Sequence, residues 1–409
     1  MKLKILSACL CVILFTSCGI VHGDKSIHVV TESRTIYSLG TVIHLNVEFP
    51  NVDDALRVLD EIAAATARID RDCDIFGDGG DGGNGDDGGS GSGGSGGSGG
   101  DGGSGSEIAT INRDGGGEVS EWLYGLLTRS FAYAEETKGA FDPTLGSLIT
   151  LWGMDDINGA RAEKSFKPPA DIAKAVYGYE HLKFVHEQYV EMDDNNIKLN
   201  LGAIAKGHAT DVAVSILGKS DCTAALLDFG GSAVFYGGDD KVRAKRKLDL
   251  THPAKDGSVL IETTLSKLTK DGRYGEYDAV FSTTSGSYRR YYEYSGKKYH
   301  HILDPATGYP ADSGVTSVTI IGGGSIADTL TDKAELPGEY EPPGEYMDAL
   351  STALFVMGAD KGLDFINRRN AVKSTKYSVI FITDDKHVRT SDDIDTAQLR
   401  ILDNAYTFA

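Results

Sequence analysis

The chain has 409 residues and a formal net charge of −20, a length that suits one large domain or two ordinary ones. An acidic chain repels nucleic acid unless it carries a local basic patch. The dense basic runs are Lys241–Lys247 and the pair Arg289-Arg290 with Lys297-Lys298. Both runs are short, so nucleic acid is not an expected partner.

The first residues predict an export signal. Two lysines precede the apolar segment Ile5–Thr16, which is too short to span a bilayer comfortably. Small residues before Cys18 make the segment similar to a bacterial lipoprotein signal, in which the cysteine carries the lipid; cleavage by ordinary signal peptidase near Gly23 is the alternative. We expect an exported protein, lipid-anchored to a bacterial membrane and facing the periplasm or the cell exterior. Residues 1–17 would be the signal peptide and residues 18–26 a tether.

Two cysteines, Cys73 and Cys222, lie beyond this signal. A disulfide between them is possible in an oxidising compartment, although isolated cysteines are more often small buried apolar residues. The sequence leaves both alternatives open. No two cysteines have the CxxC spacing that is typical of a metal site.

Hydrophobic periodicity predicts a mixture of strands and helices. The expected strands are a pair within Ile27–Phe49, a hairpin of Val185–Met192 with Asn196–Asn200, and the segments Ala224–Phe229, Val315–Ile321 and Ser378–Thr383. The expected helices are Asp53–Asp70, Ser120–Thr137, Pro168–Tyr177, a helix after the turn Leu201–Gly207, and Asp348–Met357. Because the elements do not alternate as regular βαβ units, the expected fold class is α+β, with mixed or antiparallel sheets and packed helices.

Two segments have the composition of loop insertions. Residues 77–106 are nearly all Gly, Ser and Asp, which predicts a disordered insert because nothing in it can be buried. Residues 322–347 form a second predicted insert and contain a tandem Pro-Gly-Glu-Tyr. We expect residues 27–409 to form one unit that carries both insertions.

Two short motifs could bind a phosphate or a metal ion. In Leu201–His208, small residues precede a helix with Lys206 in its first turn, a combination that attracts phosphate; a plain strand-to-helix turn is the alternative. Asp348 and Thr352 are four residues apart on one helix face, so their oxygens can reach one Mg²⁺. An N-cap aspartate with a core-facing threonine is the alternative. The stretch 328–332 has similar residues, but no apolar helix follows it.

Two further motifs place aromatic, acidic or basic groups on fixed turns. Phe141 and Asp142 follow a Gly-Ala turn and could hold a flat heterocycle, or simply end a segment of the core. The stretch Thr283–Pro310 predicts a hairpin that delivers His300 and His301 onto a loop fixed by glycine and proline. An ordinary hairpin with a solvated histidine pair is the alternative.

Taken together, these motifs resemble the ApbE family of FAD:protein FMN transferases. The likeness rests on a Lys-Gly after a strand, TSGxYxR at residues 284–290, HILDPxTGYP at residues 301–310 and DALSTALFVMG at residues 348–358. It covers most of the chain from about residue 27. The resemblance implies Mg²⁺-dependent transfer of the FMN moiety of FAD to a threonine hydroxyl of a target protein, with formation of a phosphoester and release of AMP.

The same resemblance implies roles for individual residues. Asp348 and Thr352 would hold Mg²⁺ together with the backbone carbonyl of Ala203. His301 would be the base for the target hydroxyl, because the pKa of histidine lies near neutrality, and His300 is the alternative. The residues expected to contact FAD are Leu39, Ala140, Phe141, Asp142, Asn200, Lys206 and Leu303.

Several points stay open within this resemblance. Relatives often carry Met at Leu39 and Asp at Asn200, so a charge is missing beside the expected phosphate site. The targets would be threonine-bearing proteins of exported or membrane electron-transfer systems. An FAD pyrophosphatase that hydrolyses FAD to FMN and AMP is one alternative function. An FAD-binding lipoprotein without turnover is the other.

Overall fold

A nine-stranded sheet forms the centre of the computed structural model, which describes residues 29–75, 105–154, 166–186, 188–255, 257–324 and 342–409. Neighbouring strands run antiparallel except the last pair, β15 and β17. In spatial order the strands are β1 (Val30–Ser38), β2 (Thr41–Phe49), β6 (Ala224–Asp228), β7 (Ser232–Gly237), β10 (Ala279–Gly286), β13 (Val315–Gly324), β14 (Ser378–Thr383), β15 (His387–Thr390) and β17 (Thr407–Phe408).

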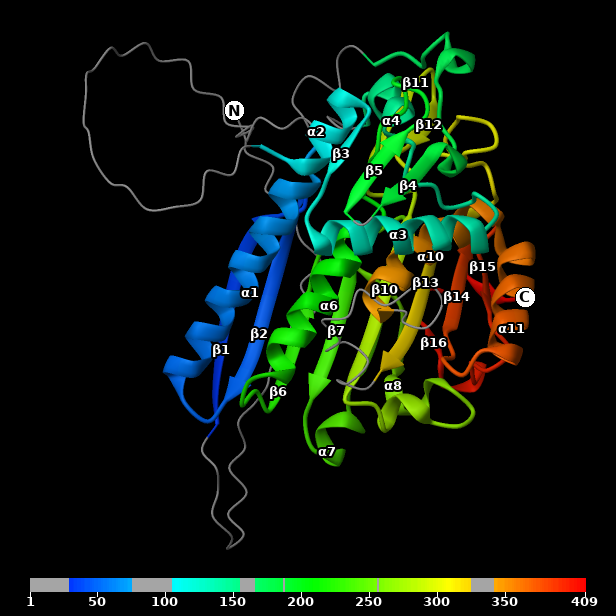
Figure 1. Cartoon of the computed structure of the whole chain (residues 1–409). Helices are drawn as coiled ribbons and strands as arrows, with labels where there is room; N and C mark the ends of the chain where they lie inside the picture. The colour runs from blue at the N-terminus through cyan, green and yellow to red at the C-terminus, as the bar shows by residue number, and fades with distance from the viewer. Residues whose placement is uncertain (1–28, 76–104, 155–165, 187, 256, 325–341) are drawn as a thin grey trace, which may run out of the picture.

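Long helices cover one face of this sheet (Figure 1). The main apolar core lies between these helices and the sheet. It includes Leu45, Ile62, Phe281 and Leu354, which are at most 1% exposed. These helices are α1 (Val52–Cys73), α6 (Ala205–Gly218), α10 (Pro343–Met357) and α11 (Ala359–Val372), while α2 (Glu107–Asp114) lies beside α1 and α3 (Glu121–Glu136) packs on α10. Asn51 begins α1 because its side chain accepts a hydrogen bond from the Asp54 N–H.

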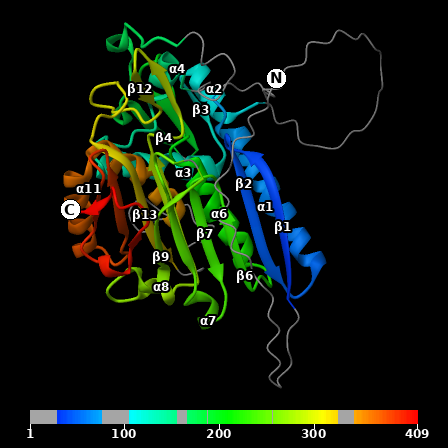
Figure 2. The same cartoon turned by 180° about the vertical axis from the view of Figure 1, so that it is seen from behind.

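A small sheet covers the opposite face, where β9 lies in front in Figure 2. Its strands are β8 (Lys247–Thr251), β9 (Val259–Thr264) and β16 (Arg400–Ile401). A second core fills the space between the two sheets, with Leu260 and Ile261 facing Val280 and Ile380. The two cores lie on opposite faces of the nine-stranded sheet. Because side chains alternate between the two faces along a strand, the neighbouring β10 residues Val280 and Phe281 enter different cores.

The remaining elements gather at one end of the sheet, at the top of Figures 1 and 2. They are the sheet of β3 (Gly116–Glu118), β5 (Tyr189–Met192) and β4 (Leu182–His186), the helix α4 (Gly146–Trp152) and the hairpin of β11 (Tyr291–Tyr294) and β12 (Lys297–His300). Trp152, Tyr292 and Leu303 belong to a third apolar cluster there. The short helices α7 (Asp240–Arg243) and α8 (Leu265–Leu268) complete the described strands and α-helices.

The predicted α+β class is confirmed, and two local predictions are wrong. The segment Pro168–Tyr177 forms only one 3-10 turn at Ile172–Lys174, since it is too short to gain from helix propagation. Asn196–Asn200 is not a strand; the hairpin is β4 with β5. The side chain of Asn112 instead bonds the N–H and the carbonyl of Leu199, at 2.7 and 3.0 Å, so this backbone is satisfied without a strand partner.

Helices or strands occupy part of both predicted insertions, so the predicted limits of the insertions are wrong. Ser106 is not part of a loop; its side chain accepts a hydrogen bond from the Ala109 N–H and begins α2. The sequence predicts a second insert over 322–347, whereas β13 continues to Gly324 and α10 begins at Pro343. Proline suits a first helical position because its missing N–H has no partner to lose there. The rest of both insertions lies outside the described residues.

Cys73 and Cys222 are both free thiols, so the disulfide alternative is not realised. The predicted signal peptide, the tether and Cys18 lie outside the described residues. Within the part of the chain that the structure describes, no helix combines the length and the apolar composition needed to cross a membrane.

Candidate active site

The predicted phosphate and metal motifs meet where α6 and α10 begin. The two helices touch through glycines: a Cβ atom added at Gly207 would lie 2.1 Å from the carbonyl oxygen of Gly344. A carboxylate on each helix also accepts hydrogen bonds from backbone N–H groups in the first turn of the other helix. Asp211 of α6 accepts from Gly344 and Glu345 at 2.9 and 2.8 Å, and Asp348 of α10 accepts from Gly207 at 2.9 Å. These contacts hold the two helix starts together.

Replacing Gly207 with alanine should destabilise the fold by about 2–3 kcal/mol, because the new methyl group must push the backbone of α10 away. Chemical denaturation monitored by circular dichroism measures the change. Gly117→Ala is the matched control, since a Cβ there meets nothing within 4 Å. Equal stability of the two variants would show that the α6–α10 contact is looser than the structure indicates.

Lys206 and Asp348 form the charged centre of this junction. The Lys206 Nζ lies 3.4 Å from Asp348 Oδ2 and also donates to the Gly202 carbonyl at 3.1 Å. Asp348 is only 3% exposed. Burial raises the pKa of its carboxyl group, and the Lys206 charge opposes that rise. A buried carboxylate beside one partly exposed lysine is poised to accept a further cation.

Hydroxyl groups surround the next turn of α10. The Ser285 hydroxyl, from β10, lies 2.7 Å from the Ser351 hydroxyl and 3.5 Å from that of Thr352. Ala203 lies in the turn that leads into α6. Asp348, Thr352 and the Ala203 carbonyl, the ligands expected from the sequence, carry oxygen atoms of the kind that Mg²⁺ prefers. Among the residues that the structure describes, no group of three or more His, Cys, Asp or Glu forms a metal cluster, so such a site would depend on neutral oxygens beside one carboxylate.

The two histidines after β12 have different environments. His300 is 9% exposed, its Nε2 lies 3.0 Å from the Ala311 carbonyl oxygen, and its Nδ1 accepts from the Ile302 N–H at 3.3 Å. Both of its ring nitrogens therefore hold the local backbone. The Nδ1 of His301 lies 3.2 Å from the Arg290 carbonyl oxygen, so Nδ1 carries the proton and the lone pair is on Nε2. This arrangement favours His301 as the base.

The surroundings of His301 keep its ring neutral. Burial and the positive charge of Arg290 lower its pKa to about 3, and Lys206 contributes to the shift. Lys206, in the first turn of α6, is thus among the charges that act on the His301 ring. A neutral imidazole can accept a proton, and an arriving phosphate anion would raise its basicity.

The lowered pKa of His301 predicts how stability depends on pH. Between the unfolded pKa of 6.5 and the folded value of about 3, the unfolded state binds more protons, so stability falls as the pH drops through this window. His301→Gln keeps a side-chain N–H but removes the titration. The variant should therefore lose less stability than the parent between pH 7 and pH 4.5 in urea unfolding experiments. An equal loss in both proteins would contradict the neutral state of His301.

Arg290 connects the hairpin to the turn between β1 and β2. Its guanidinium donates to the Gly40 carbonyl at 2.6 Å. Leu39 and Gly40 both have positive φ, 52° and 65°, as a two-residue hairpin turn requires. Leu39 is half-buried against the main core. The predicted contact residue Leu39 is thus brought close to Arg290, whose carbonyl accepts from the His301 N–H.

The side chains near Asp142 that are predicted to contact the flavin already make hydrogen bonds or packing contacts within the protein. The Asp142 carboxylate accepts from the Thr144 N–H and hydroxyl at 2.8 and 2.6 Å, and from the Tyr179 N–H at 3.1 Å. Phe141 is 2% exposed in the main core, and Leu303 is 4% exposed in the third cluster. The side chain of Phe141 is therefore not free to stack on a ligand, whereas the backbone around half-exposed Ala140 can approach one.

Asn200 links this turn to the α6 junction. Its backbone N–H donates to the Pro143 carbonyl, and its side-chain oxygen accepts from the Gly202 N–H at 2.9 Å. Asn200 thus shapes the loop before Ala203. Hydrogen bonding within the loop, rather than charge, is its observed role.

Glu345 is a buried carboxylate of the site that no sequence motif predicts. It is 1% exposed, receives two hydrogen bonds from Arg129 at 2.7 and 2.9 Å, and lies 2.6 Å from His208 Nδ1. Trp122 stacks on His208 with ring centroids 5.4 Å apart. Burial opposes ionisation, but Arg129 and His208 hold the pKa of Glu345 below its usual value. Arg129 lies on α3 and His208 on α6, so the sequence around Glu345 does not indicate these contacts.

Neutralising this carboxylate should cost about 3–5 kcal/mol of stability, because Glu345→Gln removes the negative charge that the buried Arg129 guanidinium faces. The midpoint of guanidinium unfolding measures the loss. Glu61→Gln is the control: its pair with Arg57 spans 3.9 Å between side chains that are more than half exposed, and exposed pairs contribute at most about 1 kcal/mol. Similar midpoints for both variants would rule out a structural role for the Glu345 network.

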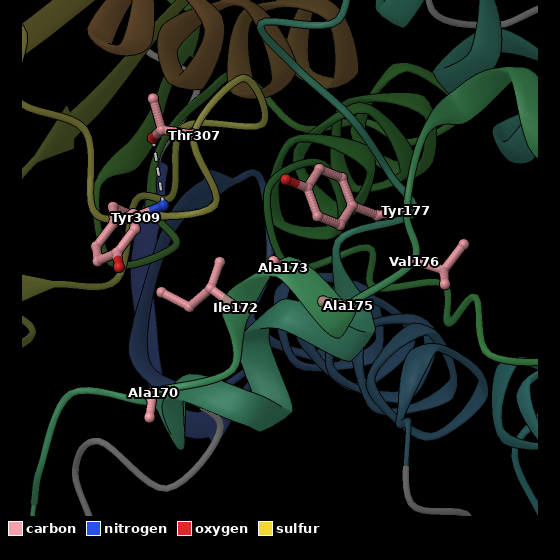
Figure 3. Close-up of a pocket in the computed structure, with 8 residues that line it drawn as sticks. All are labelled: Ala170, Ile172, Ala173, Ala175, Val176, Tyr177, Thr307 and Tyr309. Carbon is pink, nitrogen blue, oxygen red and sulfur yellow. Dashed lines mark hydrogen bonds between the residues drawn. The ribbon is translucent and has the colours of Figure 1, made fainter.

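An open cavity lies beside the loop that follows His301 (Figure 3). Ile172 and Tyr177 form one side and Thr307 and Tyr309 the other, around a volume of about 570 Å³. Gly308 allows this close approach, since an added Cβ would lie 2.6 Å from the Ile172 side chain. The Asp142 and Asp304 carboxylates both raise the pKa of Tyr177, after the larger effect of its burial. The cavity thus lies between the segment 170–177 and the loop that carries Thr307 and Tyr309.

Comparison with known proteins identifies the family. A sequence model of the ApbE family matches residues 102–339. The chain belongs to the ApbE family. It is 30% identical over 313 residues to the FAD:protein FMN transferase of Treponema pallidum, covering 73% of this chain and 76% of the relative. It is 26% identical to the enzyme of the same name from Escherichia coli K12, covering 61% of this chain and 63% of that relative.

Solved ApbE structures agree with this assignment. The crystal structure of the ApbE protein from Thermotoga maritima has a TM-score of 0.65 at 25% identity and covers 88% of this chain and 97% of that one. The flavin transferase ApbE from Vibrio cholerae has a TM-score of 0.63 at 20% identity, covers 89% of this chain and 98% of that one, and supports the fold alone. The predicted family, its fold class and its enzyme class, a transferase, are confirmed.

Proposed function

We propose that this ApbE-family protein transfers the FMN moiety of FAD to a threonine hydroxyl of a target protein. The observation that carries the proposal is the contact between Lys206 and the buried Asp348 where α6 begins, with the neutral imidazole of His301 within the electrostatic reach of Lys206. Helix N-termini and lysine favour phosphate groups. The names of the relatives supply the substrate class, FAD and an acceptor protein.

Each group has a place in the proposed reaction. His301 accepts the proton of the target hydroxyl, whose oxygen then bonds to the FMN phosphorus while the bond from that phosphorus to the bridging oxygen breaks. The products are an FMN phosphoester on threonine and AMP. Lys206 would stabilise negative charge on the phosphates. The Asp142 turn, Leu303 and the backbone at Leu39 and Ala140 would line the nucleotide site.

The oxygen donors beside Lys206 fit a magnesium ion. Asp348, Thr352 and the Ala203 carbonyl would hold Mg²⁺, which as a Lewis acid neutralises charge on a transferred phosphoryl group. Ser285 and Ser351 would orient the Thr352 hydroxyl through the contacts already described. The raised pKa of Asp348 fits this role, since a bound cation would favour its ionised form.

The target and location are proposed from the N-terminal sequence. An export signal ending at Cys18 would place the protein on a bacterial membrane, facing the periplasm or the exterior, where threonine-bearing electron-transfer proteins would be its targets. Palmitate labelling of the parent and of Cys18→Ala, both expressed with the full signal, tests this location. Label in the parent alone supports the lipid anchor.

One incubation separates transfer from the two alternatives. Purified protein is mixed with FAD, Mg²⁺ and a threonine-bearing acceptor, and both acceptor mass and free AMP are measured. An FMN-sized mass increase with an equal amount of AMP supports transfer. AMP without modified acceptor would select the FAD pyrophosphatase, and bound FAD without AMP would leave a binding protein.

A further inference from the structure

The β11–β12 hairpin and its flanks form a basic surface on an acidic protein. Residues 288–301 hold four lysine and arginine side chains against one carboxylate, Glu293, in a chain of net charge −20. Arg289, Lys297 and Lys298 are exposed. Their positive charge contrasts with the net negative charge of the chain, so the hairpin would attract anionic groups.

The hairpin is a firm support for these charges. Ser295 and Gly296 make a two-residue turn with positive φ at both positions. On one face, Tyr292 stacks on Phe166 with ring centroids 4.2 Å apart. Lys298 lies over the ring of Tyr291 at 4.2 Å and Lys297 over Tyr299 at 5.5 Å, so aromatic rings hold both lysine side chains. The cations are positioned before any partner arrives.

The base of the hairpin is part of the candidate active site. β12 ends at His300, and His301 follows directly with its N–H bonded to the Arg290 carbonyl. Arg290 in turn donates to Gly40, beside Leu39. A polypeptide that presents a hydroxyl group to His301 therefore reaches the end of β12, and its neighbouring residues can lie along the basic surface.

We propose that Arg289, Lys297 and Lys298 bind an acidic segment of the acceptor protein beside the threonine that is modified. This assignment rests on the proposed FMN transfer. Charge complementarity of this kind acts mainly on association rates and on partner choice, and salt weakens it. The hairpin thus selects acceptors, whereas the junction of α6 and α10 carries out the chemistry.

A charge-reversed variant with a matched control tests this proposal. The test variant is R289E/K297E/K298E. The control K241E/K245E/K247E reverses three exposed lysines around α7, which lies at the opposite end of the nine-stranded sheet from the hairpin in Figures 1 and 2. Two synthetic peptides serve as acceptors, each with one threonine, flanked by aspartates in one peptide and by asparagines in the other.

The proposal predicts that the parent and the control variant modify the aspartate peptide with a kcat/KM at least tenfold above that of the asparagine peptide. The hairpin variant should lose this preference through a higher KM for the aspartate peptide, with its rate on the asparagine peptide unchanged. Raising the salt concentration should reduce the parent's preference. Equal rates with both peptides in the parent, or an equal loss on both in the hairpin variant, would overturn the proposal.

Binding without FAD separates this proposal from the proposed reaction. Fluorescence anisotropy of the labelled peptides measures association even if no FMN is transferred. Tighter binding of the aspartate peptide by the parent, lost only in the hairpin variant, supports the acidic partner. No difference between the peptides overturns it. Binding of the parent and the hairpin variant to vesicles that contain anionic lipid is measured as well. If the hairpin variant loses vesicle binding but keeps the peptide preference, the basic surface binds a membrane instead.

Discussion

Replacing Asp348 with alanine should lower Mg²⁺-dependent cleavage of FAD by about 10²–10³-fold. Asp348 is the carboxylate at the α6–α10 junction, and it combines burial, a contact with Lys206 and a hydrogen bond from Gly207. Removing it takes away the charged ligand of the proposed metal site and leaves the lysine without its partner. A single electrostatic group that acts on a developing charge typically contributes an effect of this size.

The measurement is AMP release over a Mg²⁺ titration, because weaker metal binding should shift the midpoint as well as lower the maximum. Asp332→Ala is the control, since the similar stretch 328–332 also has aspartates next to hydroxyl residues. Loss of activity in the control with full activity in Asp348→Ala would move the metal site to 328–332. Circular dichroism of both variants checks that α10 is intact.

His301→Gln should reduce transfer to the acceptor by about 10²–10⁴-fold, the range for removal of a general base. The glutamine keeps a donor for the Arg290 carbonyl, to which His301 now bonds, so the local backbone should hold. The variant should still bind FAD, because the loss concerns proton removal from the acceptor. Single-turnover transfer from bound FAD measures the chemical step directly.

His300→Gln is the paired control. His300 holds the backbone of Ala311 and Ile302 and packs edge-on against Phe355 at 5.4 Å. Its replacement should therefore lower stability by about 1–3 kcal/mol through lost hydrogen bonds and packing, with transfer retained below the new unfolding temperature. The reverse pattern, slow chemistry in His300→Gln and normal chemistry in His301→Gln, would exchange the roles of the two histidines.

Local patterns predict the elements that depend on local interactions. The alternation of β2 and the helical spacing of α1 predict both elements closely, and Asn51 caps α1 as such residues do. The motif at Lys206 and the pair Asp348 and Thr352 predict a phosphate and metal junction, and the structure brings Lys206 and Asp348 within 3.4 Å. The spacing that marks these motifs is itself a consequence of helix geometry.

Predictions fail where distant residues decide the outcome. The second Pro-Gly-Glu-Tyr has the composition of a loop, yet Asp211, more than 130 positions earlier, accepts from its backbone and begins α10 there. The carboxylate of Glu345, in the same segment, forms hydrogen bonds with His208 and Arg129. Likewise, Phe141 follows a turn suited to ligand contact, but the main core covers its ring. Sequence separation hides such partners until the chain folds.

Phosphorus NMR of protein-bound FAD with Mn²⁺ in place of Mg²⁺ tests the central claim most directly. Manganese accepts the same oxygen ligands as magnesium, and its unpaired electrons broaden nearby phosphorus signals. If Asp348 and Thr352 hold the metal beside Lys206 and the pyrophosphate, both FAD phosphorus signals should broaden in the parent and stay sharp in Asp348→Ala at the same Mn²⁺ concentration. Sharp signals in the parent, or equal broadening in both proteins, would contradict this assignment of the site.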